Sequence, residues 1–94
     1  MRYMVLISLI DGGVSRDTLT QKLIRDEVQT IKELLASGKC IDAWRRFDKI
    51  GIVLFLEVEN ETECRALIET LPFRRAGVLD VELVMAVERY TEIY

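Results

Sequence analysis

Residues 50–58, with the sequence Ile-Gly-Ile-Val-Leu-Phe-Leu-Glu-Val, decide the fold. Side chains alternate across a β-strand, so the even-numbered positions of this stretch point one way while Val53 and Phe55 point the other. Both sets are apolar, so both faces of the strand need a cover. A short chain has enough helix to cover only one face of a sheet. We therefore expect the second face to pack against another copy of the chain.

The length and composition predict one globular domain over residues 1–94. Half of the 94 residues are hydrophobic and 31% are charged, with a single proline and five glycines, so no disordered block or linker is expected. The net charge is −3 and the basic residues are scattered, whereas a nucleic-acid-binding protein needs a basic stripe to neutralise phosphates. The expected partners therefore do not include nucleic acid.

The cysteines and the absence of histidine argue against a metal site or a disulfide scaffold. Cys40 and Cys64 are too few and too irregularly placed for either, and the chain contains no histidine to complete a mixed ligand set. We expect no metal, no cofactor and a reducing, cytoplasmic setting. Residues 3–10 are apolar but too short for a membrane span and lack a signal-peptide cleavage site, so no membrane association is expected.

The first part of the chain predicts a strand followed by a helix. Residues 2–10 are rich in aliphatic side chains and are typical of a buried strand, which residues 11–13 (Asp-Gly-Gly) would end. Ser15 or Thr18 offers an N-cap for the helix. The helix is expected to end just before Gly38, which suits a C-cap.

The middle of the chain predicts a hairpin. Residues 39–47 have mixed polarity, as expected for an edge strand, with Ala43 and Arg45 on the face opposite to Trp44. A tight turn at residues 48–49 (Asp-Lys) would lead into residues 50–58.

The last part predicts a second helix and a final strand. Asn60 is the expected N-cap, and the helix is expected to end before Pro72. Residues 78–87 are expected to form a strand whose odd-numbered positions share one apolar face. The tail, residues 88–94, keeps enough apolar area to pack on a neighbouring subunit.

This order of elements predicts an α+β fold of the ferredoxin-like βαββαβ type, with a four-stranded antiparallel sheet. In the strand order 4-1-3-2, the two doubly apolar strands, first and third, lie in the centre, and the more polar strands form the edges. The helices cover one face of the sheet. Packing of the other face on a second subunit would give a dimeric α+β barrel, as a homodimer or a larger homo-oligomer.

Glu27 is the residue that breaks the pattern of the first helix. At about 100° per residue, one stripe of this helix is apolar and contains Leu23, Ile24, Val28, Ile31, Leu34 and Leu35. Glu27 falls inside that stripe, where an unpaired carboxylate is costly. Three interpretations stay open: the side chain reaches water or a basic residue, it forms a structural salt bridge with Arg45 or Arg46, or it enters a pocket where burial raises its pKa and suits it to act as a general base.

A set of spaced motifs resembles the muconolactone δ-isomerase family over most of the chain. The motifs are Arg25-Asp26-Glu27, Leu34, Gly38, Trp44-Arg45, Phe55, Glu57-Val58 and Leu71-Pro72. The resemblance implies a cofactor-independent isomerase of aromatic catabolism that moves a proton between carbons of an unsaturated lactone or a related carboxylate. It also implies a ferredoxin-like fold that assembles through dimeric barrels.

The resemblance assigns roles to individual residues. Glu27 matches the family's helix carboxylate and would be the catalytic base, and Arg45 is the matching cation for a substrate carboxylate. The doublet partner Arg46, together with Arg74 and Arg75 (residues 74–75), supplies further anion-binding candidates. Trp44 is a candidate wall of the pocket, or simply a core aromatic.

This sequence differs from the family's pattern in the first strand and after Leu71-Pro72. The family's first strand carries a His and a Lys, whereas this chain has Met4 and Leu6 at those positions, and Tyr3 offers a hydroxyl instead. After Leu71-Pro72 the sequence continues as residues 73–77 (Phe-Arg-Arg-Ala-Gly), where the family has apolar and aromatic residues and a second proline. A different pocket entrance and substrate are therefore expected.

The sequence leaves more than one function open. The first hypothesis is a cofactor-independent enzyme that acts on a small organic acid or lactone, with Glu27 as the base and an arginine as the anion clamp. The second is a non-catalytic small-molecule-binding or assembly protein of the same fold. A haem-handling relative of the barrel ranks last, because the chain has no histidine to ligate iron.

Overall fold

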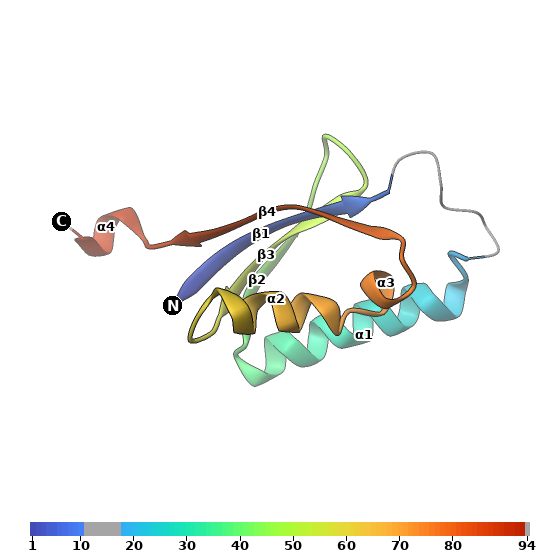
Figure 1. Ribbon diagram of the computed structural model, residues 1–94, viewed down its shortest axis with the longest axis horizontal. Coiled ribbons are helices and arrows are strands. Elements are labelled where there is room, and N and C mark those ends of the chain that lie inside the picture. Colours follow the sequence, from blue (N-terminus) through green and yellow to red (C-terminus); the bar gives the residue numbers. More distant parts are fainter. Residues whose placement is uncertain (11–17, 94) are drawn as a thin grey trace.

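The fold is a four-stranded antiparallel sheet with helices on one face, as a computed structural model that describes residues 1–10 and 18–93 shows (Figure 1). The elements follow in the order β1 (Arg2–Leu9), α1 (Gln21–Ser37), β2 (Cys40–Arg45), β3 (Gly51–Glu57), α2 (Glu61–Glu69), α3 (Pro72–Arg75), β4 (Leu79–Val87) and α4 (Tyr90–Ile93). The strands lie side by side in the order β2-β3-β1-β4. The predicted ferredoxin-like βαββαβ fold is confirmed.

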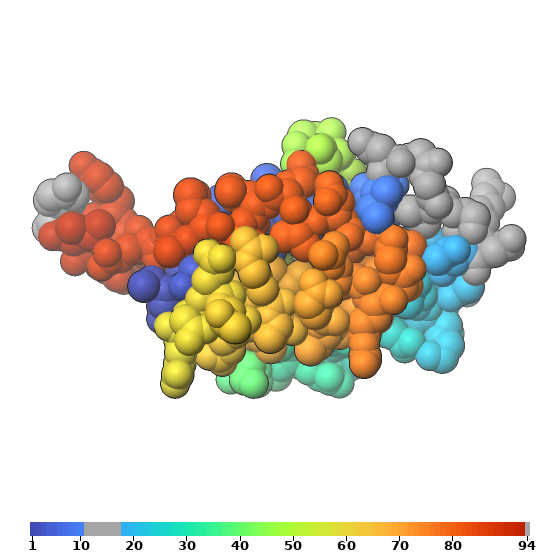
Figure 2. Space-filling model, viewed as in Figure 1, coloured from blue at the N-terminus to red at the C-terminus, as the bar shows by residue number. Residues whose placement is uncertain are grey.

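The core lies between the two central strands and the helices. Val5 and Ile7 of β1 and Leu54 and Leu56 of β3 are fully buried on the helix side of the sheet, where Ile68 of α2 packs against them. Because both strands are apolar on both faces, they take the central positions, as the sequence predicts. Figure 2 shows α2 and β4 on the same face of the molecule, with α4 projecting from the body beyond the end of β4.

The caps of α1 fix where this helix begins and ends. Thr20 is the N-cap, and its hydroxyl accepts a hydrogen bond from the backbone N–H of Leu23 at 3.1 Å. The helix therefore starts two residues later than an N-cap at Thr18 would place it, and the alternative cap Ser15 lies outside the described residues. Gly38 adopts the left-handed conformation (φ +80°) and donates to the Leu35 carbonyl, which confirms the predicted C-cap.

Two backbone features around α2 and α3 matter for the site below. Asn60 is the N-cap of α2, as predicted, because its side-chain oxygen accepts from the backbone N–H of Glu63 at 2.9 Å. Pro72 follows the end of α2, also as predicted, but it starts the short helix α3 as well. The helix α3 was not predicted from the sequence, although proline suits the first position of a helix.

A β-bulge in β4 changes which side chains face the helices. Leu6 pairs with Leu83, but the next residue, Ile7, pairs with Val81, so Glu82 is an extra residue in β4. The bulge reverses the alternation, so Leu83 shares the outer face with Leu6 while Val81 stays on the helix side with Ile7. The prediction that the odd-numbered residues of 78–87 share one face is therefore wrong.

A second register shift lies in β2, between Cys40 and Asp42. Beyond it, Ala43 and Arg45 lie on the face opposite to Trp44, as predicted, and the register places Ala43 and Arg45 on the helix side. The strand ends at Arg45, and residues 46–50 form a loop in place of the predicted tight turn at residues 48–49.

The outer face of the sheet carries an apolar centre. It is formed by the outward side chains of Met4, Leu6, Val53, Phe55, Leu83 and Met85, which are partly to clearly exposed. Figure 1 shows α1 and α2 on the opposite face, and within residues 1–10 and 18–93 no helix covers the outer one. Packing of this face on a second copy stays a prediction, as does docking of the exposed Tyr90 and Ile93 of α4 on a neighbour.

None of the helices within the described ranges is both long enough and apolar enough to cross a bilayer.

Candidate functional site

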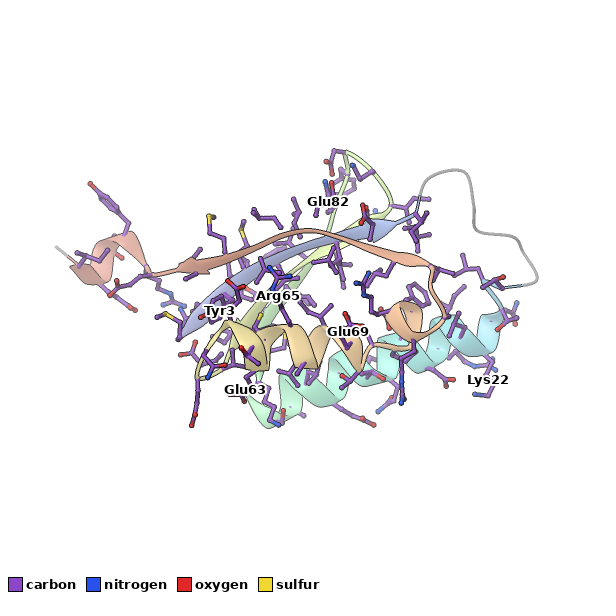
Figure 3. All side chains as sticks on the ribbon, viewed as in Figure 1. Tyr3, Lys22, Glu63, Arg65, Glu69 and Glu82 are labelled. Carbon is purple, nitrogen blue, oxygen red and sulfur yellow. The ribbon has the colours of Figure 1, made fainter. Side chains whose placement is uncertain are left out.

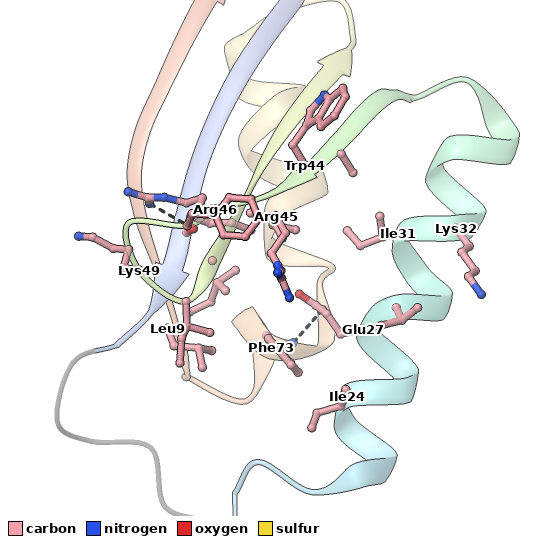
Figure 4. Close-up of a pocket in the computed structure, with 18 residues that line it drawn as sticks. Leu9, Ile24, Glu27, Ile31, Lys32, Trp44, Arg45, Arg46, Lys49 and Phe73 are labelled. Carbon is pink, nitrogen blue, oxygen red and sulfur yellow. Dashed lines mark hydrogen bonds between the residues drawn. The ribbon is translucent and has the colours of Figure 1, made fainter.

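A cavity of about 690 Å³ lies between α1, α3 and the end of the sheet where β2 turns into β3 (Figure 4). Most of its wall is apolar and includes Ile7, Ile24, Val28, Ile31, Ile52 and Leu79. The loop 46–50 forms one side of it. On the helix side of β3, Leu54 and Leu56 are buried in the core, as is Val58 just after the strand. The cavity lies at the other end of β3, where Gly51 and Ile52 line it.

The carboxylate of Glu27 enters this cavity from α1 and is deeply buried. Its side chain is 6% exposed, whereas the flanking apolar residues Ile24 and Val28 are 41% and 47% exposed. The buried side of α1 is thus centred on Glu27, with Leu23, Ile31 and Leu34 partly buried around it. The structure differs here from the expected stripe, since Ile24 and Val28 border the cavity instead of packing in the core.

Within residues 1–10 and 18–93, one hydrogen bond holds the Glu27 carboxylate. The backbone N–H of Phe73, in α3, donates to Glu27 Oε1 at 3.1 Å, and Figure 4 marks this bond. Burial raises the pKa of Glu27 above its ordinary value, and the hydrogen bond from Phe73 offsets part of that rise. Glu27 makes no ion pair with any residue of the described part of the chain. Of the three interpretations, the salt bridge to Arg45 or Arg46 is absent within the described residues.

Arg45 brings a positive charge to the same cavity. It lies opposite Ile52 on the helix side of the sheet, and Figure 4 shows its guanidinium directed toward the Glu27 carboxylate. The guanidinium carbon lies 5.0 Å from the ring centre of Phe47, within the range of a cation–π contact. Within the described residues Arg45 has no ion-pair partner. An apolar cavity that joins a guanidinium to a carboxyl group with a raised pKa can hold an anion and exchange a proton with it.

Arg46 lies beside the cavity but its guanidinium is already engaged. It pairs with Asp48 at 2.6 Å and with Glu82, and it donates to the Ile7 carbonyl at 3.4 Å. These contacts direct it across the sheet to β4 rather than to Glu27.

The remaining candidates from the sequence lie at the border of the cavity or outside it. Trp44 borders it and is largely exposed. Tyr3 is buried in the core and does not line the cavity. Arg74 donates to Glu69 at 3.0 Å and to the Leu79 carbonyl at 2.9 Å, while Arg75 is exposed, and neither lines the cavity.

The sequence did not predict most of the lining residues, among them Phe47, Lys49, Ile50 and Phe73. Phe47 and Ile50 carried a signal, because two large apolar residues next to a polar turn are unusual and are strongly exposed here. The contribution of Phe73 is its backbone N–H. The proline before it marks the start of a helical turn, where N–H groups need outside acceptors.

The cysteines take no part in this site. Cys40 and Cys64 are both free and buried in the core, and burial raises the pKa of each thiol. Over residues 1–10 and 18–93, no group of three or more His, Cys, Asp and Glu side chains is placed to hold a metal ion.

Comparison with known proteins identifies the fold but not a family. No protein-family model and no curated protein matches the sequence. Among solved structures, 5-chloro-2-hydroxyhydroquinone dehydrochlorinase from Burkholderia phenoliruptrix AC1100, in complex with 2,5-dihydroxybenzoquinone, is similar in fold. The TM-score is 0.76, the sequence identity is 17%, and the match covers 98% of each chain. This likeness supports the fold assignment, and the muconolactone δ-isomerase family stays a resemblance.

Proposed function

We propose that the protein binds a small organic acid or unsaturated lactone in the cavity beside α1 and moves a proton between two carbons of it, with Glu27 as the base. The observation that carries this proposal is the position of Glu27, which is 6% exposed in an apolar cavity shared with Arg45. Burying a carboxylate without an ion pair costs free energy, and a functional role explains why such a residue is kept.

The proposed reaction needs one proton and no cofactor. The ionised Glu27 carboxylate takes a proton from the carbon next to the substrate carbonyl, which leaves a dienolate and a protonated Glu27. The protonated carboxyl then delivers its proton one allylic position away, and the double bond moves; between the two steps this proton exchanges with solvent in part of the turnovers. A raised pKa makes the carboxylate a stronger base and helps it hold the proton between the two steps.

Arg45 would hold the anionic part of the substrate and stabilise the dienolate. Its guanidinium faces the cavity beside Phe47, whose ring supports it from one side. Charge developing on the substrate oxygen would be stabilised by a fixed cation in an apolar surrounding, where electrostatic interactions are stronger than in water.

The likeness to a solved enzyme supports a small oxygenated ring as the substrate class. The similar structure is that of a dehydrochlorinase of 5-chloro-2-hydroxyhydroquinone with 2,5-dihydroxybenzoquinone bound. Both compounds are single rings rich in oxygen, as are lactones derived from aromatic compounds. The same fold therefore accommodates ligands of this size and polarity.

The alternative is a binding or assembly protein without chemistry. The observation that favours it is the hydrogen bond from the Phe73 N–H, which gives Glu27 a structural task in fixing α3 to α1. Under this alternative the cavity binds organic acids through Arg45, and Glu27 need not exchange a proton.

We also propose that the chain forms a homodimer through the outer face of the sheet, in a reducing cytoplasm. The apolar centre of this face, which includes Phe55 and Met85, supports the first part, because large apolar patches mark interaction surfaces. The free cysteines Cys40 and Cys64 support the second, since reducing compartments keep thiols unpaired.

The test of the chemistry is turnover of muconolactone and a panel of unsaturated lactones by the wild type and by Glu27→Gln. Gln keeps the size of the side chain and an oxygen for the Phe73 N–H but cannot act as a base. We expect turnover by the wild type and a loss of about 10²-fold or more in the variant. Glu33→Gln is the matched control on the exposed side of the same helix. Equal activity in wild type and Glu27→Gln would contradict the proposal.

Binding is tested separately from turnover. Trp44 is the single tryptophan of the chain and borders the cavity, so its fluorescence reports on occupancy. We expect Arg45→Gln to weaken binding of organic acids about tenfold, with Arg65→Gln on the remote helix α2 as the control. Binding that depends on Arg45, with no turnover by any variant, would favour the binding-protein alternative.

A further inference from the structure

The loop 46–50 forms one side of the cavity, although its apolar side chains do not anchor it. Phe47 is 90% exposed and Ile50 is also strongly exposed, so burial of these side chains contributes little to the position of the loop. The loop directly follows Arg45, the cavity cation. Its position therefore affects where the guanidinium and its partner ring lie.

Two cations of this loop meet on a single carboxylate of β4. Arg46 donates to Glu82, and Lys49 Nζ donates to Glu82 Oε1 at 2.9 Å. Asp48, which belongs to the same loop, accepts hydrogen bonds from Arg46 Nη2 at 2.6 Å and from Arg46 Nε at 2.9 Å. The Arg46 side chain is only 7% exposed, whereas Asp48 is 63% exposed, so the guanidinium lies against the protein while its partner in the loop remains in contact with water.

The bulge in β4 places Glu82 at this point. Glu82 is the extra residue of the register shift, and the carbonyl of Ile7 at the same shift accepts a second bond from Arg46 at 3.4 Å. Next to it, Gly51 lies so close to β1 that an added Cβ would be 2.1 Å from the Ile7 oxygen. From the start of the loop, Arg46 thus reaches across β3 and β1 to β4. Bulges redirect side chains in this way, often beside active sites.

The charge state of Glu82 fits this arrangement. The hydrogen bonds from Lys49 and Arg46, with a further one from the Ser8 side chain, hold the pKa of Glu82 below its usual range. Arg46 lowers the pKa of Asp48 in the same manner. Both carboxylates therefore stay ionised at neutral pH.

We propose that Glu82 is a positioning residue, which anchors the loop 46–50 and thereby holds the Arg45 guanidinium over the cavity. Glu82 does not line the cavity and would not touch a ligand. Glu82 lies on β4 beside the loop 46–50, as Figure 3 shows. The inference goes beyond the proposed function, because it names the residue that sets the geometry of the cation rather than a group that binds or reacts.

The test uses the whole chain and compares Glu82→Gln with Asp80→Asn, an exposed carboxylate of the same strand. The first readout is amide hydrogen exchange at Arg46, whose N–H donates to the Gly51 carbonyl across the base of the loop. In Glu82→Gln we expect exchange there to become about tenfold faster, because two charge-assisted bonds are weakened, with Cys64 in α2 unchanged. An unchanged rate at Arg46, or an equal increase at Cys64, would overturn the proposal.

The second readout follows Arg45 directly. We expect the NMR order parameter of the Arg45 Nε–H bond to fall in Glu82→Gln and to stay at the wild-type value in Asp80→Asn. A purely structural role of Glu82 would leave the Arg45 side chain as ordered as in the wild type, and that result would contradict positioning.

Binding of benzoate, followed through Trp44 fluorescence, separates this inference from the proposed function. We expect Glu82→Gln to weaken benzoate binding several-fold in the presence of Arg45 and to have no further effect in an Arg45→Gln background. Loss of Arg45 order in Glu82→Gln together with no benzoate binding by the wild type would support positioning and count against the proposed function. Equal weakening in both backgrounds would contradict positioning through Arg45.

Discussion

Replacing Glu27 by Gln is expected to change the free energy of unfolding by an amount that depends on pH. The Glu27 carboxyl is buried, and its pKa in the folded state is raised above the ordinary 4.5. Below pH 4.5 the group is protonated in both the folded and the unfolded chain, so its contribution to stability is fully present. As the pH rises through the folded-state pKa, the unfolded chain has already lost the proton, and the wild type loses stability.

The structure sets the size of this effect through the burial of one group. Each unit by which the pKa is raised corresponds to about 1.4 kcal/mol of unfolding free energy lost at high pH. Gln cannot ionise, and its side-chain oxygen can still accept from the Phe73 N–H. Glu27→Gln is therefore expected to match the wild type below pH 4.5 and to exceed it in stability at about pH 8, where the wild type carries the cost of ionising a buried carboxyl.

Urea unfolding followed by circular dichroism at these two pH values measures the difference. A second variant, Glu27→Leu, separates the charge from the hydrogen bond, because it leaves the Phe73 N–H without its acceptor. It is expected to fall about 1–3 kcal/mol below Glu27→Gln at both pH values. Glu33→Gln, on the exposed side of α1, is the matched control for the substitution itself. If the wild type instead gained stability relative to Glu27→Gln as the pH rises, the pKa of Glu27 would not be raised in the folded state.

Three further predictions follow from the packing. Gly51→Ala should lower the unfolding free energy by about 3 kcal/mol in urea titrations, because its Cβ would lie 2.1 Å from a carbonyl oxygen of β1. Gly38→Ala would meet no atom and should cost about 1 kcal/mol for its positive φ, so equal costs of the two substitutions would contradict this prediction. Phe55→Lys on the outer face should shift light scattering from dimer to monomer, and monomeric wild type would refute the dimer. Cys40 and Cys64 should resist iodoacetamide until the chain unfolds, so rapid native alkylation would contradict their burial.

The sequence predicted the elements and their order because the signals are local. The nearly continuous apolar runs over residues 2–10 and 50–58, the N-cap Asn60 and the C-cap Gly38 each act within a few residues. The apolar character of the first and third strands on both faces then fixed them at the centre of the sheet. All of these predictions are confirmed by the strand order and caps.

The faces of β4 were not predictable in the same way. A bulge adds one residue and reverses every later side chain, and nothing in residues 78–87 marks Glu82 as the extra one. The position of Glu82 depends on the pairing of β4 with β1 and on Arg46 and Lys49, which lie in a loop that is distant in the sequence. Long-range pairing of this kind is invisible to a local pattern.

The candidate site was predictable in part. A carboxylate at a core position of a helix pointed to Glu27, and alternation along residues 39–47 separated Arg45 from Trp44. Only the pairing of Arg45 with Ile52 showed that Arg45 lies on the helix side. The hydrogen bond from Phe73 was missed because α3 depends on how the chain turns after α2. The engagement of Arg46 was missed because its partner Glu82 lies 36 residues away.

The most direct test of the central claim is transfer of solvent deuterium to a bound lactone. Muconolactone, or another unsaturated lactone that shifts Trp44 fluorescence, is incubated in D₂O with wild type, Glu27→Gln or Glu33→Gln and analysed by mass spectrometry. If Glu27 removes a proton and shares it with solvent, the wild type and Glu33→Gln should label the lactone at carbon and Glu27→Gln should not. Equal labelling by all three proteins, or no labelling of a lactone that the wild type binds, would contradict the account.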